Sequence, residues 1–410
     1  MPVEDPGPLR VRAFLLLTCS CGLENLAIWA FYGTLIATFT YKLSADVRQL
    51  AMLGAALSLP YVLGTVLWGF VVDRWSPKWV YVIGLCSMLA SILVGWGAAS
   101  TVRTVGAVLL LGLGLGALEP SRSAITALVI PQADLVRANA VLSLTLQITL
   151  LTGSFLGGLL LEATNASMAH AASLLVGVLA LPFALLIPDV RQRGVVPELT
   201  LTDLGRGLRT SWNTPELRLL LFISATGWMV FSTFFVFEPI YVRTVLHGEE
   251  SAILFLWASH GVGAIAGAVV ITRVRRGTGR ELALVGSGVV VSGIGLLIYA
   301  GFGTFALALL GAAGMGAGLA FIFPPALALV QRVVQEEERG RVSGVLMSMQ
   351  ASCSAGCAVE TASGSPSSAG PSSTTCPAYT LLLGYGSAAD SFLLPLYATW
   401  YKPAESSVIA

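Results

Sequence analysis

The chain has 410 residues, of which 55% are hydrophobic and only 11% are charged, and its mean hydropathy is +0.81. Soluble globular domains carry about a quarter charged residues, so this composition excludes most soluble enzymes. Because 23 basic residues nearly balance 22 acidic ones, the chain lacks the positive field that binds nucleic acid, and we expect no nucleic-acid partner.

Long apolar stretches predict an all-α membrane protein, because a bilayer core takes about 20 apolar residues per helix. Six spans are expected first, at residues 13–38, 48–71, 79–99, 104–130, 138–161 and 169–188. Six more are expected at 219–242, 251–271, 281–300, 303–332, 342–356 and, as the weakest, 379–400. The last two helices are therefore predicted to be irregular.

A polar stretch with several arginines separates the two sets of spans. We expect an N-terminal six-helix bundle at 1–188, a cytoplasmic central loop at 189–218 and a C-terminal bundle at 219–410, atypical from about 355. The two halves also repeat each other. A shift of 204 positions lays Gly112, Gly114, Pro120 and Arg137 on Gly316, Gly318, Pro324 and Arg341. Such repeats let transporters build two bundles that rock about a central site.

The loop between the second and third spans carries Gly69, then Asp73 and Arg74, and later Lys78. This pattern resembles the loop signature of the major facilitator superfamily. The resemblance covers roughly residues 10–350 and implies two six-helix bundles related by a pseudo-twofold axis. In physical terms, the glycine permits close helix packing, and the aspartate binds a helix N-terminus or an arginine. We expect a conformational latch that comprises Gly69, Asp73, Arg74, Lys78, Arg137 and Arg341.

The fifth span contains Gly153, Gly157 and Gly158, which we expect to set close helix packing. This segment is similar to the antiporter signature of the superfamily, although Ser154 stands where that signature has proline. The segment from Pro120 to about residue 140 is similar to siderophore and macrolide exporters of the superfamily.

Among the ionisable residues inside the expected spans, three stand out: Glu24 in the first span, and Glu119 and Arg122 in the fourth. A charge at the centre of a membrane helix costs about 2.5–3.5 kcal/mol on insertion scales, so each needs a partner or a function. The resemblance implies that both spans line the central cavity. One acid is then a candidate proton carrier, and the alternative is a static ion pair that fixes two helices.

Aromatic residues in the seventh and eighth spans form a second group of candidates. A stripe on one face of the seventh span suits an apolar or cationic substrate if it faces the cavity, but such a stripe is more often lipid-facing or core. His260 is either a proton-sensitive group or a hydrogen-bonded core histidine. The substrate-cavity candidates are Tyr32, Trp228, Phe231, Phe235, Glu238 and His260.

These features predict a monomeric multi-pass transporter of the cell membrane that exports a small, partly apolar molecule, such as a drug, siderophore or metabolite, in exchange for protons by alternating access. No cofactor, metal or enzymatic activity is expected, because the chain contains neither a G-x-S-x-G nor a G-x-x-x-x-G-K motif. Two alternatives stay open: an importer or facilitator of the same fold, and a membrane receptor or scaffold.

The sequence changes character near its C-terminus. Between Cys353 and Cys376 it turns to Ser, Gly, Pro and Thr, which lack the apolar surface of a membrane span. We interpret this change as a reading-frame slip in the source gene. The alternative is a real glycine- and serine-rich segment that lines a polar cavity. The six cysteines show no metal-binding spacing and are expected to be packing residues.

Basic residues define the orientation. With a cytoplasmic N-terminus, eighteen of them lie inside, and four lie outside, namely Lys42, Arg48, Arg103 and Arg243. Cytoplasmic loops of membrane proteins carry the excess of Lys and Arg.

We therefore predict that reporter fusions after Arg193 and after Arg276 will report the cytoplasm, and that a fusion near Glu249 will report the outer side. Paired phosphatase and fluorescent-protein fusions measure this directly. An outside signal from the central loop would contradict the two-bundle arrangement.

Overall fold

The computed structural model describes residues 8–97, 100–131, 134–189, 238–273 and 278–333, together with residues 212, 214, 217, 218 and 223. Its long helices are α1 (Pro8–Lys42), α2 (Val47–Arg74), α3 (Pro77–Gly95), α4 (Thr101–Val129), α5 (Leu135–Ala163), α6 (Ala166–Leu186), α9 (Glu250–Thr272), α10 (Thr278–Gly301) and α11 (Phe305–Val333). The expected spans at 342–356 and 379–400, the atypical C-terminal stretch and most of the span at 219–242 lie outside the described residues, as does the central loop from residue 190 to 211.

By their length and composition, all nine of these helices in the described part of the chain are long and apolar enough to cross a membrane. Their bounds follow the expected spans closely: α4 covers 101–129 where 104–130 was predicted. The predicted all-α membrane fold is confirmed. Large apolar side chains such as Leu63 and Leu175, 62% and 64% exposed, are then suited to contact lipid rather than water.

Short polar sequences between the apolar stretches define where the helices begin. Asp46 caps α2: its side chain accepts a hydrogen bond from the Gln49 N–H at 2.8 Å, and the Gln49 side chain accepts one from the Asp46 N–H at 3.0 Å. Asn165 caps α6 by accepting a bond from the Met168 N–H at 3.1 Å. Such caps satisfy backbone donors that a helix leaves unpaired at its start.

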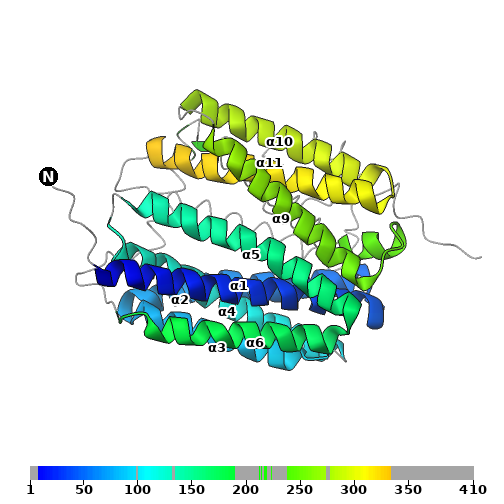
Figure 1. Cartoon of the computed structure of the whole chain (residues 1–410), viewed down its shortest axis with the longest axis horizontal. Helices are drawn as coiled ribbons and strands as arrows, with labels where there is room; N and C mark the ends of the chain where they lie inside the picture. Colours follow the sequence, from blue (N-terminus) through cyan, green and yellow to red (C-terminus); the bar gives the residue numbers. More distant parts are fainter. Residues whose placement is uncertain are drawn as a thin grey trace, which may run out of the picture.

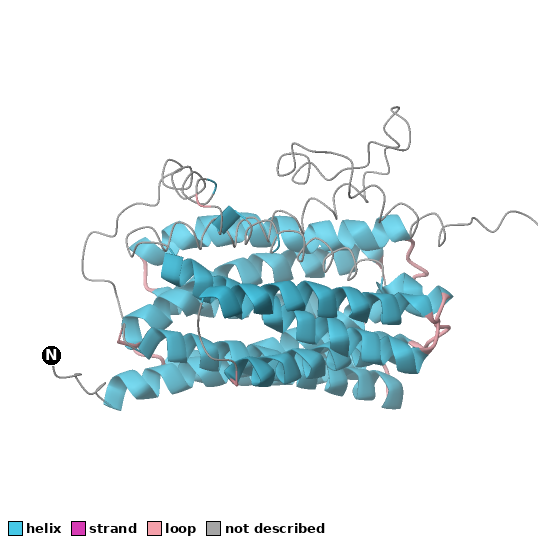
Figure 2. Cartoon of the chain, turned by 90° about the horizontal axis from the view of Figure 1, so that it is seen from above, coloured by secondary structure: helices cyan, strands magenta, loops and turns pink. Residues whose placement is uncertain are grey.

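The helices run roughly along one common axis and form two groups (Figures 1 and 2). Helices α1 to α6 form the first group, in which α3 and α2 pack on α4, and α5 and α6 pack on α1. Helices α9, α10 and α11 form the second group. Helix α9 also packs against α5 and α1, so it joins the two groups.

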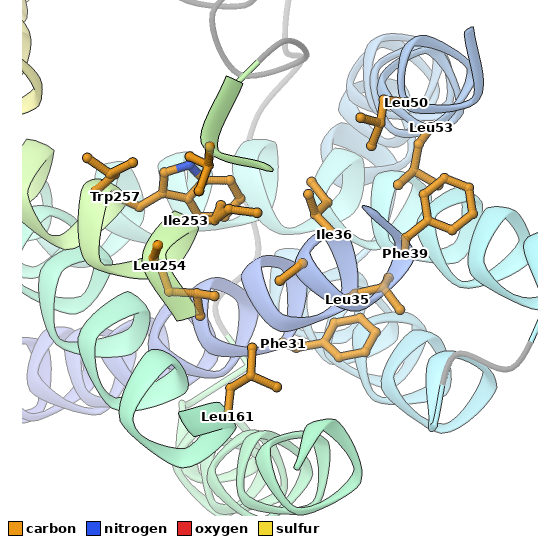
Figure 3. Packing of buried hydrophobic residues seen from close by; sticks show 14 of the residues in the cluster. Phe31, Leu35, Ile36, Phe39, Leu50, Leu53, Leu161, Ile253, Leu254 and Trp257 are labelled. Carbon is orange, nitrogen blue, oxygen red and sulfur yellow. The ribbon is translucent and has the colours of Figure 1, made fainter. Parts of the chain in front are cut away.

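Two apolar clusters fill these contacts. One lies within the first group and contains Tyr81, Leu85 and Met88 of α3, with Leu111 and Leu118 of α4. The other extends across the two groups: Figure 3 shows Phe31 and Leu35 of α1 in the same cluster as Leu254 and Trp257 of α9. This second cluster places α1 at the boundary between the groups.

Glycines allow backbones to meet where helices cross. A Cβ atom built on Gly116 of α4 would lie 2.8 Å from the Gly64 Cα of α2, and one built on Gly84 of α3 would lie 3.0 Å from the Gly114 oxygen. Small residues at such crossings are typical of membrane helices, because backbone contact replaces the hydrophobic drive that is absent in lipid.

We predict that Gly116→Val will destabilise the protein, because no room exists for two extra methyl groups and an added Cβ against the α2 backbone. Overpacking of this kind costs about 1–3 kcal/mol. The matched control is Gly286→Val on α10, which makes the same change where a Cβ meets nothing within 4 Å. Thermal unfolding in detergent, followed by size-exclusion chromatography, should show a lower midpoint for Gly116→Val alone; equal midpoints would contradict the close crossing.

Candidate functional site

A charged cluster in the first group is built around Arg122 of α4. Its Nη2 atom lies 3.7 Å from Oε1 of Glu24 on α1 and 3.2 Å from Oε2 of Glu119, one turn earlier on α4. The Arg122 and Glu24 side chains are 9% and 1% exposed, whereas that of Glu119 is 56% exposed. The structure thus brings together the three residues singled out in the sequence, but Glu119 lies at the accessible edge of the cluster rather than inside it.

Further polar side chains surround the buried part of the cluster. Arg122 Nη1 donates to the Cys21 sulfur at 3.2 Å. The Tyr81 side chain of α3 lies against the Glu24 carboxylate and its hydroxyl donates to Ser20 Oγ at 3.2 Å. Among the described residues, Oε2 of Glu24 has no hydrogen-bond partner. The carboxylate therefore keeps one oxygen that can accept a proton.

Helix α5 fixes the position of α1 beside this cluster. Asn25, the residue after Glu24, donates from Nδ2 to Thr149 Oγ1 at 2.6 Å and to the Leu146 oxygen at 3.1 Å. One turn further along α5, a Cβ on Gly153 would lie 2.7 Å from the Leu26 oxygen. Hydrogen bonds and backbone contact together hold α1 and α5 in register at the level of the charged cluster.

The other glycines of the same α5 segment face both α1 and α9. A Cβ on Gly157 would lie 3.0 Å from the Ala30 Cα and 2.9 Å from Leu254 Cδ2, and one on Gly158 would lie 3.2 Å from Leu254 Cβ. Ser154 is fully buried in this segment. The antiporter-like segment therefore lies at the contact between the two helix groups.

A second buried acid, Glu238, lies at the start of the described helical residues 238–244. Its Oε2 accepts a hydrogen bond from Trp257 Nε1 at 2.6 Å and its Oε1 accepts one from the Tyr299 hydroxyl at 3.1 Å. Tyr32 of α1 stacks on Trp257 with ring centroids 5.9 Å apart, and Trp29 meets Trp257 edge-on at 5.8 Å. Aromatic contacts thus connect Glu238 to α1.

The remaining cavity candidates differ in their placement. His260 is 8% exposed and interacts with the backbone of Ala312 on α11, which is the arrangement of a core histidine. Tyr32 is partly buried and touches the second group through Trp257. Trp228, Phe231 and Phe235 lie outside the described residues.

The predicted latch is described only in part. Lys78 Nζ donates to the Leu185 oxygen at 2.6 Å, near the C-terminus of α6, where a cation complements the exposed carbonyls. A Cβ on Gly69 would meet nothing within 4 Å, so among the described residues Gly69 makes none of the close helix contact predicted for it. The side chains of Asp73, Arg74 and Arg137 and the whole of Arg341 lie outside the described part.

A clasp joins the two groups at the end of the molecule where α1 ends. Arg243 donates from Nη1 to the Thr40 oxygen at 2.5 Å and from Nη2 to the Ala45 oxygen at 3.1 Å. Nearby, the Tyr41 hydroxyl donates to the Gly248 oxygen at 2.5 Å. The Thr40 oxygen belongs to the last turn of α1, which leaves its carbonyls without intrahelical partners, whereas Ala45 and Gly248 lie in the loops before α2 and α9.

Sequence reasoning did not find several residues of these sites. The contacts of Cys21, Tyr81 and Tyr299 depend on which helix faces meet, and no local pattern in the sequence reports that. Arg243 could have been singled out in the sequence, because it is one of the few basic residues on the expected outer side. The sequence does not indicate which groups it binds. Within the described residues no group of three His, Cys, Asp or Glu side chains lies close enough to hold a metal ion.

Comparison with known proteins places the chain in a family. A model of the Major Facilitator Superfamily matches residues 17–356. Among curated proteins, the multidrug efflux pump Tap of Mycolicibacterium fortuitum is 26% identical over 371 residues, which cover 84% of this chain and 85% of the pump.

Solved structures of the same fold include proteins that differ in what they carry. The nucleoside transporter NupG has a TM-score of 0.60 at 16% identity, with 86% of this chain and 90% of that chain covered. A D-xylose–proton symporter has a TM-score of 0.61 at 15% identity, with 85% and 88% covered. At these identities the likeness shows the fold alone.

We predict that Arg122→Gln will destabilise the protein, because Glu24 would then have either to keep a buried charge without a cation or to take up a proton. Breaking a buried pair from one side costs about 3–5 kcal/mol. Glu119→Gln should change stability by less than about 1 kcal/mol, since that carboxylate is more than half exposed.

The double variant Glu24→Gln/Arg122→Gln should recover part of the loss, because neither buried charge remains. Thermal unfolding midpoints in detergent test all three variants. A double variant that is no more stable than Arg122→Gln alone would contradict pairing as the cause.

Proposed function

Since the chain belongs to the major facilitator superfamily, we propose that it exports a small, partly apolar molecule across the cell membrane in exchange for protons. The observation that carries this proposal is the cluster of Glu24, Glu119 and Arg122 within the membrane-spanning helices. Superfamily membership makes the chain a transporter of small molecules; the cluster supports the finer assignment of proton coupling.

The charge balance of the cluster supports proton exchange. Two carboxylates share one guanidinium, so the cluster carries one uncompensated negative charge when both acids are ionised. An uncompensated charge is costly in a membrane helix, and binding one proton makes the cluster neutral. Glu24 is buried with a free oxygen, and Glu119 is exposed. A proton can therefore be held inside while the second acid faces a cationic or polar group of the substrate.

The contacts between the two helix groups support alternating access. They are closed at the α1 C-terminal end by Arg243 and Tyr41, and along α5 and α9 the side chains of Leu254 and Phe255 pack against Gly157 and Gly158. The hydrogen bonds of the clasp, to carbonyls of the α1 end and of two loops, can break one at a time and be replaced by water. In the topology that the basic residues predict, this end is the outer one, so the structure is closed to the outside.

Export and substrate class rest on two further points. The curated relative Tap is named as a multidrug efflux pump, and the glycine segment of α5 resembles the antiporter signature, with Ser154 in place of its proline. Partly buried Trp29 and Tyr32 offer ring faces at the group boundary, which suit an apolar molecule. We further propose that the protein works as a monomer with its N-terminus in the cytoplasm, with two bundles joined by the loop at 189–218.

We predict that Glu24→Gln will abolish uphill export but leave downhill exchange, because a neutral glutamine mimics one protonation state permanently. The assay uses everted membrane vesicles with an imposed pH difference and a panel of aromatic dyes and antibiotics, first chosen by protection of growing cells. Ethidium accumulation, followed by fluorescence, is the first readout.

The matched control is Glu162→Gln, which removes an exposed carboxylate at the last turn of α5 and should leave export unchanged. Normal uphill export by Glu24→Gln would remove Glu24 as the proton site. Proton-driven accumulation in right-side-out vesicles, with none in everted ones, would assign an importer instead.

A further inference from the structure

Glu238 is the one acid of the described second group that is almost completely buried, with 2% exposure. Both of its oxygens are hydrogen-bonded, one to the Trp257 indole and one to the Tyr299 hydroxyl. The charged cluster of the first group does not include it. Its environment therefore needs an explanation of its own.

Among the described residues, no cation offsets the cost of burying this acid. Within the described residues no lysine or arginine forms an ion pair with Glu238. Arg243, on the same helical segment, is bound to the Thr40 and Ala45 carbonyls, and His260 of α9 interacts with the Ala312 backbone. The other titratable groups around the site are the phenols of Tyr32, Tyr241 and Tyr299. A permanently ionised carboxylate at membrane depth with only neutral donors is expensive.

The hydrogen-bond geometry accepts a proton without rearrangement of any heavy atom. An indole N–H can only donate, so Trp257 always requires Oε2 as its acceptor. A phenol hydroxyl can donate or accept. Tyr299 can therefore donate to Oε1 when the acid is charged and accept from it when the acid is protonated, by rotation of one O–H bond. A hard metal cation would instead require about six oxygen ligands, and the described surroundings provide a carboxylate and one hydroxyl.

The acid is also connected to the boundary between the two groups. Trp257, which holds Oε2, contacts Tyr32 and Trp29 of α1, and α1 carries Glu24 about two turns before Tyr32. A change in the strength of the hydrogen bond from Trp257 to Glu238 thus acts on the Trp257 side chain, which packs directly against α1, the helix that carries Glu24.

We propose that Glu238 is a second proton-carrying carboxylate, so that each helix group contributes one acid to the exchange and Trp257 transmits the state of Glu238 to α1. This inference rests on the proposed proton-coupled transport. The proton is taken from water on one side of the membrane, resides on Oε1 and is released to water on the other side.

Infrared difference spectroscopy of the full-length protein in liposomes tests the protonation. The C=O stretch of a protonated carboxyl group is separate from the amide bands. Between about pH 8 and pH 6, above the range in which exposed carboxylates take up protons, two such bands should appear in the wild type, one lost in Glu238→Gln and the other in Glu24→Gln, with both kept in Glu162→Gln. If every titrating band survives in Glu238→Gln, the proposal is overturned.

Trp257→Phe provides a second variant that keeps the acid. It removes the donor to Oε2, so the band assigned to Glu238 should move to higher frequency. Trp79→Phe, which removes an exposed indole of α3 in the first group, should leave the band in place. An unmoved band in Trp257→Phe would overturn the assignment.

Transport tests the coupling. The steady-state ethidium gradient in everted vesicles should rise more steeply with the imposed pH difference in the wild type than in Glu238→Gln, with about half the slope on a logarithmic scale in the variant. Equal slopes would overturn Glu238 as a carried-proton site. Absence of any proton-driven ethidium movement in the wild type would contradict the proposed function instead, and the infrared titration would still decide whether Glu238 exchanges a proton.

Discussion

A charge inside a membrane must find its partner within the protein, and the pairing of Arg122 with Glu24 and Glu119 is where this constraint acts most strongly. The guanidinium spans two helices: Glu24 belongs to α1, and Arg122 and Glu119 to α4. Neighbouring residues support this arrangement. The Cys21 sulfur accepts a hydrogen bond from Arg122 Nη1, and Asn25 links α1 to α5 through its hydrogen bond to Thr149. The arrangement of α1, α4 and α5 therefore follows from the need to shield and neutralise one set of charges.

Close helix packing at glycines is the second constraint. Lipid provides no hydrophobic drive between helices, so stability comes from backbone contact at glycines such as Gly64, Gly116 and Gly157. Within the first group these contacts join helices that must stay together. At the contact of α5 with α9, the glycines of α5 instead receive side chains of α9, with Leu254 and Phe255 lying against Gly157 and Gly158.

Hydropathy and spacing predicted the membrane helices, because a span needs about 20 apolar residues and a charged residue within it is costly. For the same reason Glu24, Glu119 and Arg122 were visible in the sequence as exceptions to that rule. Their exposure could not be predicted from the sequence, since the difference between buried Glu24 and accessible Glu119 depends on which helix face meets a neighbour. The partners of Glu238 were equally hidden: Trp257 and Tyr299 are ordinary aromatic residues of apolar spans until the packing of α9 and α10 brings them to one carboxylate.

Helix α1 links all of these features in one rigid element. It carries Glu24 at the charged cluster, Trp29 and Tyr32 at the aromatic contact with Trp257, and Thr40 and Tyr41 at the clasp. With a rise of 1.5 Å per residue, these levels are about 12 Å apart along the helix. A helix transmits tilt and translation along its length, because its backbone hydrogen bonds resist bending. Any shift of α1 at the level of Glu24 would therefore alter the aromatic contact and the clasp together, because all three levels belong to one helix.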